Sequence, residues 1–206
     1  MCIRDRDNTA QDALARAISE QETRTDAELV TVLARQADDY RYVTVMWAAL
    51  LSLLVPAVLL FLPVWLTPFE ALLLQWGVLL GLAVLFRVKP IQFRLVPRRL
   101  QQARAAGLAR QAFLQQGLHR TKGATGVLIF VSEAEHYVEI LADQGIAQHV
   151  PDSEWQSMVD AFIADLKRGD VAKGFQECVA ACGDKLAAHV PATEQKNELP
   201  NHLVIL

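Results

Sequence analysis

Residues 42–86 read YVTVMWAALLSLLVPAVLLFLPVWLTPFEALLLQWGVLLGLAVLF, and Glu70 is the only charged residue among them. The part before Glu70 has no charge at all, and the part after it consists mainly of Leu, Val, Ala and Gly. A bilayer core of about 30 Å needs about 20 mostly apolar residues per helix. The stretch therefore predicts two transmembrane helices, over residues 43–63 and 68–88, which form a hairpin.

The turn of this hairpin is expected at residues 63–67. Thr67 followed by Pro68 is typical of a helix start, because proline suits the first helical position and threonine suits the cap before it. The alternative is a helical hairpin buried in the core of a soluble protein. We favour the membrane, because the rest of the chain is too short to cover such a hairpin on every side.

Basic residues gather on one side of the predicted hairpin. Residues 87–122 contain no Asp or Glu, whereas residues 63–69 contain no Lys or Arg. Because cationic flanks stay in the cytoplasm, the sequence predicts a two-pass protein of the bacterial cytoplasmic (inner) membrane with both termini in the cytoplasm. Its partners are then the lipid bilayer and anionic lipid head groups. The expected contacts with lipids or other anions are Arg98, Arg99, Arg104, Arg120 and Lys122.

Composition argues against two other classes of protein. The formal net charge is −3 and no aromatic platform accompanies the basic residues, so we expect no nucleic-acid partner. Three cysteines do not make the even framework of a disulfide-built extracellular module.

Cys178 and Cys182 lie one helical turn apart and could ligate a metal. No second pair or histidine cluster completes such a site, so packing in a reduced core is the favoured interpretation.

Shorter periodic segments surround the hairpin. An early helix is expected over residues 11–22 and a β-prone run over residues 28–34. Beyond the membrane, the patterns predict strands at 127–131 and 136–142, which the short link between them should pair as an antiparallel hairpin. A further helix is expected at 98–118. Another should start at 151–153, with Asp152 or Ser153 as its cap, and a last helix should cover 171–189.

One strand thus precedes the membrane hairpin and two follow it, and an isolated strand cannot satisfy its backbone groups. We therefore predict one α/β domain, a small mixed sheet flanked by helices, that the two-helix transmembrane hairpin interrupts. Its two pieces are residues 7–40 and 98–190, and residues 191–206 form a tail whose apolar end should dock. Residues 1–6, MCIRDR, match a translated sequencing adapter and are expected to be foreign to the native protein.

The segment TKGATGVLIFV at residues 121–131, followed by ILADQGI at residues 140–146 and then Trp155, resembles the TPM domain. That family is named for thylakoid-lumen, photosystem-repair and receptor-modulating members. ETRTDAE at residues 22–28 is similar to the approach to the family's first strand, and NELP at residues 197–200 is similar to a signature near the C-terminus of many bacterial members.

The resemblance implies a central sheet with helices on both faces and, in some members, bound calcium or magnesium. Asp143 stands where a strand ends, and Gly145 lets the backbone turn. The Asp143 carboxylate would therefore project from the sheet edge as a ligand for such a cation. Glu28 stands at the acidic position of the family's first strand and could approach the same edge. Glu135, in the strand turn, is a weaker candidate ligand. The alternative for each is a solvated carboxylate or a turn cap.

Two functions remain open. The first is an accessory or regulatory domain that acts on membrane complexes, with a membrane protein as its partner. The second is a metal-dependent phosphatase tethered to the membrane, an activity proposed for some members of the family. Arg120 and Lys122 could bind an anion, and Thr121 and Thr125 offer hydroxyls. The first is favoured, because no phosphate-binding loop and no complete catalytic constellation is evident.

Overall fold

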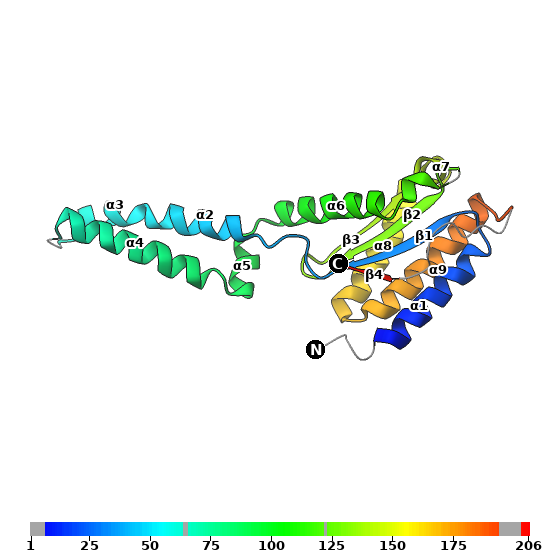
Figure 1. The fold of residues 1–206 in the computed structure, drawn as a ribbon, viewed down its shortest axis with the longest axis horizontal. Coiled ribbons are helices and arrows are strands. Elements are labelled where there is room, and N and C mark those ends of the chain that lie inside the picture. Colours follow the sequence, from blue (N-terminus) through cyan, green and yellow to red (C-terminus); the bar gives the residue numbers. More distant parts are fainter. Residues whose placement is uncertain (1–6, 64–65, 122, 194–202) are drawn as a thin grey trace. The chain divides into compact units, whose positions relative to one another are not determined.

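The computed structural model describes residues 7–63, 66–121, 123–193 and 203–206. The chain divides into two compact units, of which the first joins Met1–Ala37 to Gln102–Leu206 and the second is Asp38–Gln101 (Figure 1). The first six residues, expected to be an adapter scar, lie outside the described residues.

A four-stranded mixed sheet with the strand order β3-β2-β1-β4 forms the centre of the first unit. β1 runs parallel to β2 and to β4, while β2 and β3 form an antiparallel pair. The predicted mixed sheet and its antiparallel hairpin are therefore confirmed. The strands are β1 (Glu28–Ala34), β2 (Gly126–Ser132), β3 (Tyr137–Ala142) and β4 (Leu203–Ile205).

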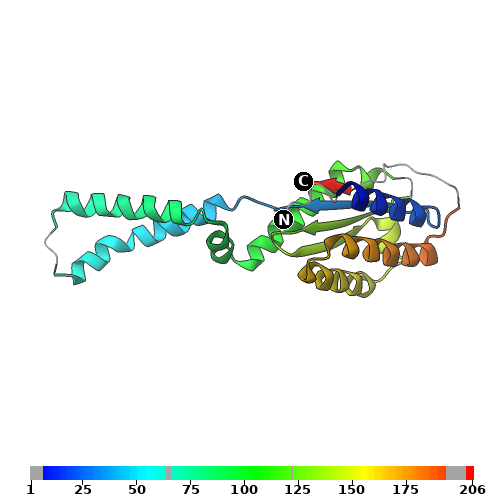
Figure 2. The ribbon, with the colours of Figure 1, turned by 90° about the horizontal axis from the view of Figure 1, so that it is seen from below.

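Helices cover both faces of this sheet, which is why every residue of β1 and β2 is buried (Figure 1, Figure 2). On one face, α6 (Arg98–Gln115) packs three small side chains, Ala105, Ala109 and Ala112, against the strands. On the other face lie α1 (Asp7–Glu22), α8 (Asp152–Arg168) and α9 (Val171–His189). Helix α8 begins where expected, but the cap is Pro151 and no side chain caps it.

The C-terminal tail contributes the fourth strand. Thr31 to Leu33 of β1 pair with Leu203 to Ile205, and the N–H of Leu206 donates to the carbonyl of Leu33 at 2.9 Å. The predicted docking of the tail is thus an extension of the sheet. The NELP segment at residues 197–200 lies outside the described residues.

The second unit is a helical hairpin followed by a short helix. Thr67 caps α4 as predicted, because its hydroxyl accepts the N–H of Glu70 while the Glu70 carboxylate accepts the N–H of Thr67. The first arm is interrupted at Leu53, where Pro56 has no N–H to donate to the carbonyl of Ser52. The helices are α2 (Arg41–Ser52), α3 (Leu54–Phe61), α4 (Pro68–Leu85) and α5 (Lys89–Leu95).

An aromatic cluster joins the two ends of this hairpin. Tyr40 is fully buried and its ring meets that of Phe93 edge to face, with centroids 5.9 Å apart. The side-chain amide of Gln92 donates to the carbonyl of Asp39. These contacts bring the segments before and after the hairpin together at one end of the second unit.

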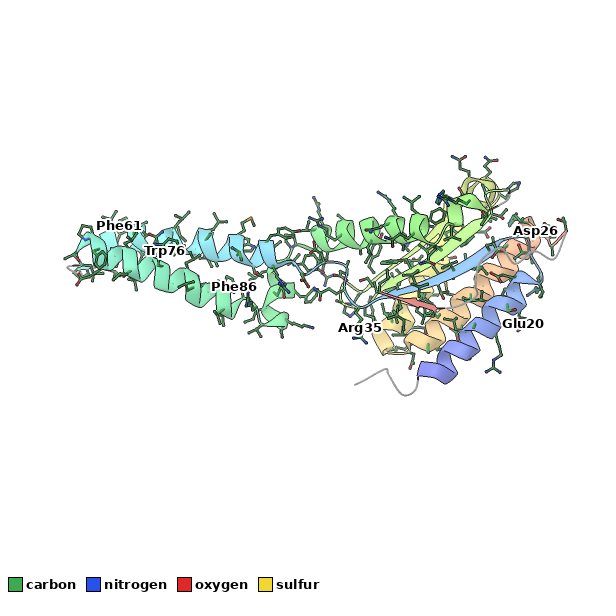
Figure 3. The ribbon with its side chains drawn as sticks, viewed as in Figure 1. Glu20, Asp26, Arg35, Phe61, Trp76 and Phe86 are labelled. Carbon is green, nitrogen blue, oxygen red and sulfur yellow. The ribbon has the colours of Figure 1, made fainter. Side chains whose placement is uncertain are left out.

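The arms of the hairpin expose apolar side chains along their length. Arg41–Phe61 and Pro68–Leu85 are long and apolar enough to cross a membrane, and only 22% and 0% of the residues in their most hydrophobic windows are buried. Phe61 is 89% exposed and Trp76 is 56% exposed (Figure 3). Such a surface is unusual for a monomeric protein in water.

Candidate functional site

Two of the three predicted cation ligands lie at the same edge of the sheet, where β1 and β2 begin and β3 ends. Glu28 is in register with Gly126, and the N–H of Asp143 donates to the carbonyl of Gly126 at 2.9 Å. One strand separates Glu28 from Asp143, so their backbones are about 10 Å apart at a strand spacing of about 4.8 Å. We call this region, residues 26–28, 121, 123–126 and 143–145, the acidic edge.

Asp143 caps the short helix α7 (Gln144–Ala147). Its carboxylate accepts the N–H of Gln144 at 2.7 Å, and its carbonyl accepts the N–H of Ala147 at 2.9 Å. The residue is partly exposed. Its carboxylate therefore has a structural role as a cap and still reaches solvent.

Gly145 is required for space. The N–H of Gly145 donates to the carbonyl of Ala124 at 3.0 Å. A Cβ at this position would stand 2.2 Å from the carbonyl oxygen of Gly123 and 2.7 Å from that of Ala124. Gly145 is not among the described glycines with positive φ. The expectation that it lets the backbone turn is therefore replaced by a packing reason, the close approach of two backbone segments.

The hydroxyls offered for phosphate chemistry are both engaged with the backbone. Thr121 donates to the carbonyl of Leu118 at 3.0 Å and accepts the N–H of Thr125 at 3.1 Å. Thr125 donates to the carbonyl of Asp26 at 3.0 Å. These bonds shape the loop before β2, and a nucleophilic role would require breaking them.

Further carboxylates flank Glu28, which is buried. Asp26 accepts the N–H of Thr193 at 3.0 Å as well as its hydroxyl (Figure 3). Glu22 accepts the N–H of Leu29 at 3.0 Å. The sequence indicates Glu22 and Asp26 only through the resemblance of ETRTDAE to the TPM family. Their position just before the buried strand β1 is the signal that could have placed them at this edge of the sheet.

Glu135 lies at the opposite edge of the sheet, where β2 ends. Its carboxylate accepts the N–H of Ala37 at 3.1 Å and the hydroxyl of Ser132. The seven residues of β2 separate this edge from the acidic edge by about 20 Å at about 3.3 Å per residue. The structure therefore does not bring Glu135 together with Glu28 and Asp143.

We expect Glu135→Gln to lower the free energy of unfolding by about 2 kcal/mol, because hydrogen bonds to a charged acceptor contribute about 1.5–3 kcal/mol. Chemical unfolding of the detergent-solubilised protein measures this effect. The neighbouring Glu133→Gln serves as the control and should change stability by less than about 0.5 kcal/mol. Equal losses of unfolding free energy in the two variants would show that the hydrogen bonds of Glu135 to Ala37 and Ser132 do not stabilise the fold.

Four of the five basic residues proposed for anion or lipid contact are described by the structure, and all four are exposed. Arg98 and Arg99 stand in the first turn of α6 and are exposed. Arg104 and Arg120 are also exposed, and the Nε of Arg120 donates to Nε2 of His119 at 3.3 Å. Lys122 lies outside the described residues.

A second polar group on β3 was not expected. Burial raises the pKa of Glu139, whose carboxylate is hydrogen-bonded to the Tyr137 hydroxyl near Arg110 of α6. Burial and the same carboxylate raise the pKa of Tyr137. Alternation along the strand could have placed both side chains on one face, but the contact with α6 follows only from the packing.

The described residues of the acidic edge do not form a closed metal cage. Within the part of the chain that the structure describes, no group of three or more His, Cys, Asp or Glu side chains is placed to hold a metal ion. Calcium takes six to eight oxygen ligands and magnesium keeps several waters. At this edge, the Asp143 carboxylate would hold such a cation, with water supplying most of the remaining ligands.

Comparisons with known proteins agree with this architecture. The sequence model of the TPM domain matches residues 90–185, which include α6, β2, β3 and the Asp143 loop. The chain is similar in fold to the NMR structure of the BA42 protein from the psychrophilic bacterium Bizionia argentinensis, with a TM-score of 0.59 and 18% identity. That similarity covers 96% of this chain and 93% of the BA42 chain. No curated protein matches the sequence.

Proposed function

Because this chain belongs to the TPM domain family, we propose that it is a membrane-anchored accessory or regulatory protein whose TPM domain acts on membrane complexes from the cytoplasmic side. In this proposal the hairpin holds the protein in the bilayer. The first unit, with its acidic edge, then meets a membrane protein partner.

The exposed apolar surface of the hairpin is the observation that carries this proposal. Pro68–Leu85 has no fully buried residue in its most hydrophobic window, and Leu73, Leu80 and Val84 are each more than half exposed in the described chain. Lipid tails would remove these side chains from water, and backbone hydrogen bonding within the helices suits the hydrocarbon core.

The distribution of positive charge supports the orientation. Arg87, Lys89 and Arg94 follow α4, and Arg98 and Arg99 follow α5. The other end of the hairpin, residues 63–69, has no Lys or Arg. In the proposed orientation the basic end lies in the cytoplasm, where anionic head groups attract it, and both pieces of the TPM domain continue from that side.

The state of the polar groups favours an accessory role over a phosphatase. Thr121 and Thr125 both donate their hydroxyls to backbone carbonyls. Glu135 is bound at the far edge. A phosphatase needs a nucleophile and several groups that converge on one phosphate. The acidic edge is better suited to bind calcium or magnesium in a partner interface, with Asp143 and Glu28 as its carboxylates.

Cation-dependent melting and aryl phosphate hydrolysis of the detergent-purified protein test this function. We expect calcium or magnesium to raise the melting temperature, as a ligand of the folded state does, with no turnover above the chelator blank. Asp143→Asn should abolish the shift, whereas Asp160→Asn, at an exposed position of α8, should retain it. Turnover that Asp143→Asn abolishes would support the phosphatase instead, and a missing shift in the parent protein would contradict the cation site.

A further inference from the structure

Three sulfur atoms meet in the core between α8 and α9. Cys178 and Cys182 share one face of α9, one turn apart, and their Sγ atoms are 4.0 Å from each other. The Sδ of Met158 on α8 is 3.8 Å from the Sγ of Cys182. All three residues are at least nine-tenths buried, with exposed fractions of 5%, 0% and 9%. We call these residues the sulfur triad.

The two sulfur-to-sulfur distances suit a single metal ion. If each metal–sulfur bond is about 2.3 Å long, two sulfurs that are 4.0 Å apart give an S–metal–S angle of about 120°. The pair that is 3.8 Å apart gives an angle of about 110°. These are the angles of trigonal or tetrahedral coordination. Two of the three sulfur pairs are therefore already at the spacing that a shared ion needs.

We propose that Cys178, Cys182 and Met158 form a site for one Cu(I) ion. Two thiolates and a thioether are soft ligands, the kind that selects Cu(I) over harder cations. Structural zinc sites use four Cys, His or carboxylate ligands, and the described residues place no group of even three such side chains for a metal. The sequence alone indicates only the cysteine pair, and the third ligand, Met158, lies 24 positions before Cys182.

A cavity leads from the surface to two members of the triad. Its volume is about 230 Å³, and its lining includes Met158 and Cys178 together with the exposed residues Ser157, Ala161 and Glu177. Copper could thus reach the sulfurs along the seam between α8 and α9 without unfolding of the domain.

The Cys182 thiol keeps its proton when no metal is bound. The hydrogen bond with Cys178 and complete burial raise the pKa of the Cys182 thiol. Binding of Cu(I) as a bis-thiolate releases two protons to the solvent and involves no change of oxidation state. Because the ion must displace these protons, only a strongly thiophilic metal competes well at neutral pH.

Anaerobic titration of the detergent-purified full chain against a chromophoric Cu(I) chelator tests the site. A Cys2→Ser background removes the remaining cysteine of the chain. We expect one Cu(I) per chain and a higher melting temperature in its presence. Met158→Leu should weaken binding at least about tenfold, since changes in the outer shell of a metal site alone cost 10–100-fold. Met46→Leu, at an exposed position of α2, should bind like the background.

Two further measurements separate ligation from folding. Cys178→Ser should abolish the binding while circular dichroism shows a folded protein, and X-ray absorption of the loaded background should report three sulfur neighbours at about 2.3 Å. Unchanged affinity in Met158→Leu, or fewer than three sulfur neighbours, would overturn the proposal. Zn(II) binding of equal strength in the same competition would overturn the choice of metal.

Discussion

Gly145→Ala is expected to lower the free energy of unfolding by at least about 3 kcal/mol, at the upper end of the costs of overpacking. The added Cβ would stand 2.2 Å from the carbonyl oxygen of Gly123 and 2.7 Å from that of Ala124. Both obstacles are backbone atoms of a loop that Thr121 and Thr125 hold by hydrogen bonds, so neither can rotate away. The hydrogen bond between Gly145 and Ala124 would be strained as well.

Chemical unfolding of the detergent-solubilised protein measures this loss. Gly107→Ala is the matched control, because Gly107 lies within α6 and a Cβ there meets nothing within 4 Å. Alanine in a helix interior should raise stability by up to about 1 kcal/mol relative to glycine. If Gly145→Ala were as stable as the parent, the close packing of α7 on residues 123–124 would be refuted.

Leu80→Arg should prevent insertion of the hairpin into the membrane. Leu80 is 63% exposed on α4, near the middle of the predicted second span, where an arginine costs about 2.5–3.5 kcal/mol on insertion. Leu114→Arg is the control, because Leu114 is 58% exposed on the part of α6 that belongs to the first unit. An arginine there remains in water, so we expect little change.

Labelling of intact cells with a membrane-impermeant maleimide measures insertion. Leu66→Cys places a thiol at the proposed outer turn, in the Cys2→Ser background, where the buried Cys178 and Cys182 should not react. We expect labelling of residue 66 in this background and in Leu114→Arg, and its loss in Leu80→Arg. Labelling that persists in Leu80→Arg would count against the membrane-spanning hairpin.

Much of the fold was predictable because its signals are local. The cap at Thr67 depends on two adjacent residues, and the bounds of α9 agree with the predicted 171–189. The run at 127–131 is continuously apolar and the run at 28–34 is mostly so, as buried parallel strands are. By contrast, β4 is three residues long and has no periodicity, so only its contact with β1 makes it a strand.

The candidate site was less predictable, because its residues are distant in sequence. Asp143 and Glu28 share an edge only because β2 lies between their strands, whereas Glu135 is eight residues from Asp143 and lies at the other edge. The role of Gly145 depends on Gly123 and Ala124, in a loop that precedes β2 and β3. Met158 meets Cys182 through the packing of α8 on α9.

The amino-acid sequence by itself determined which segments are apolar, where helices begin and which charges flank the hairpin. These properties depend on neighbours within a few residues. Only the tertiary structure decided which carboxylates share an edge and which sulfurs meet, because strand register and helix pairing depend on contacts between segments far apart along the chain.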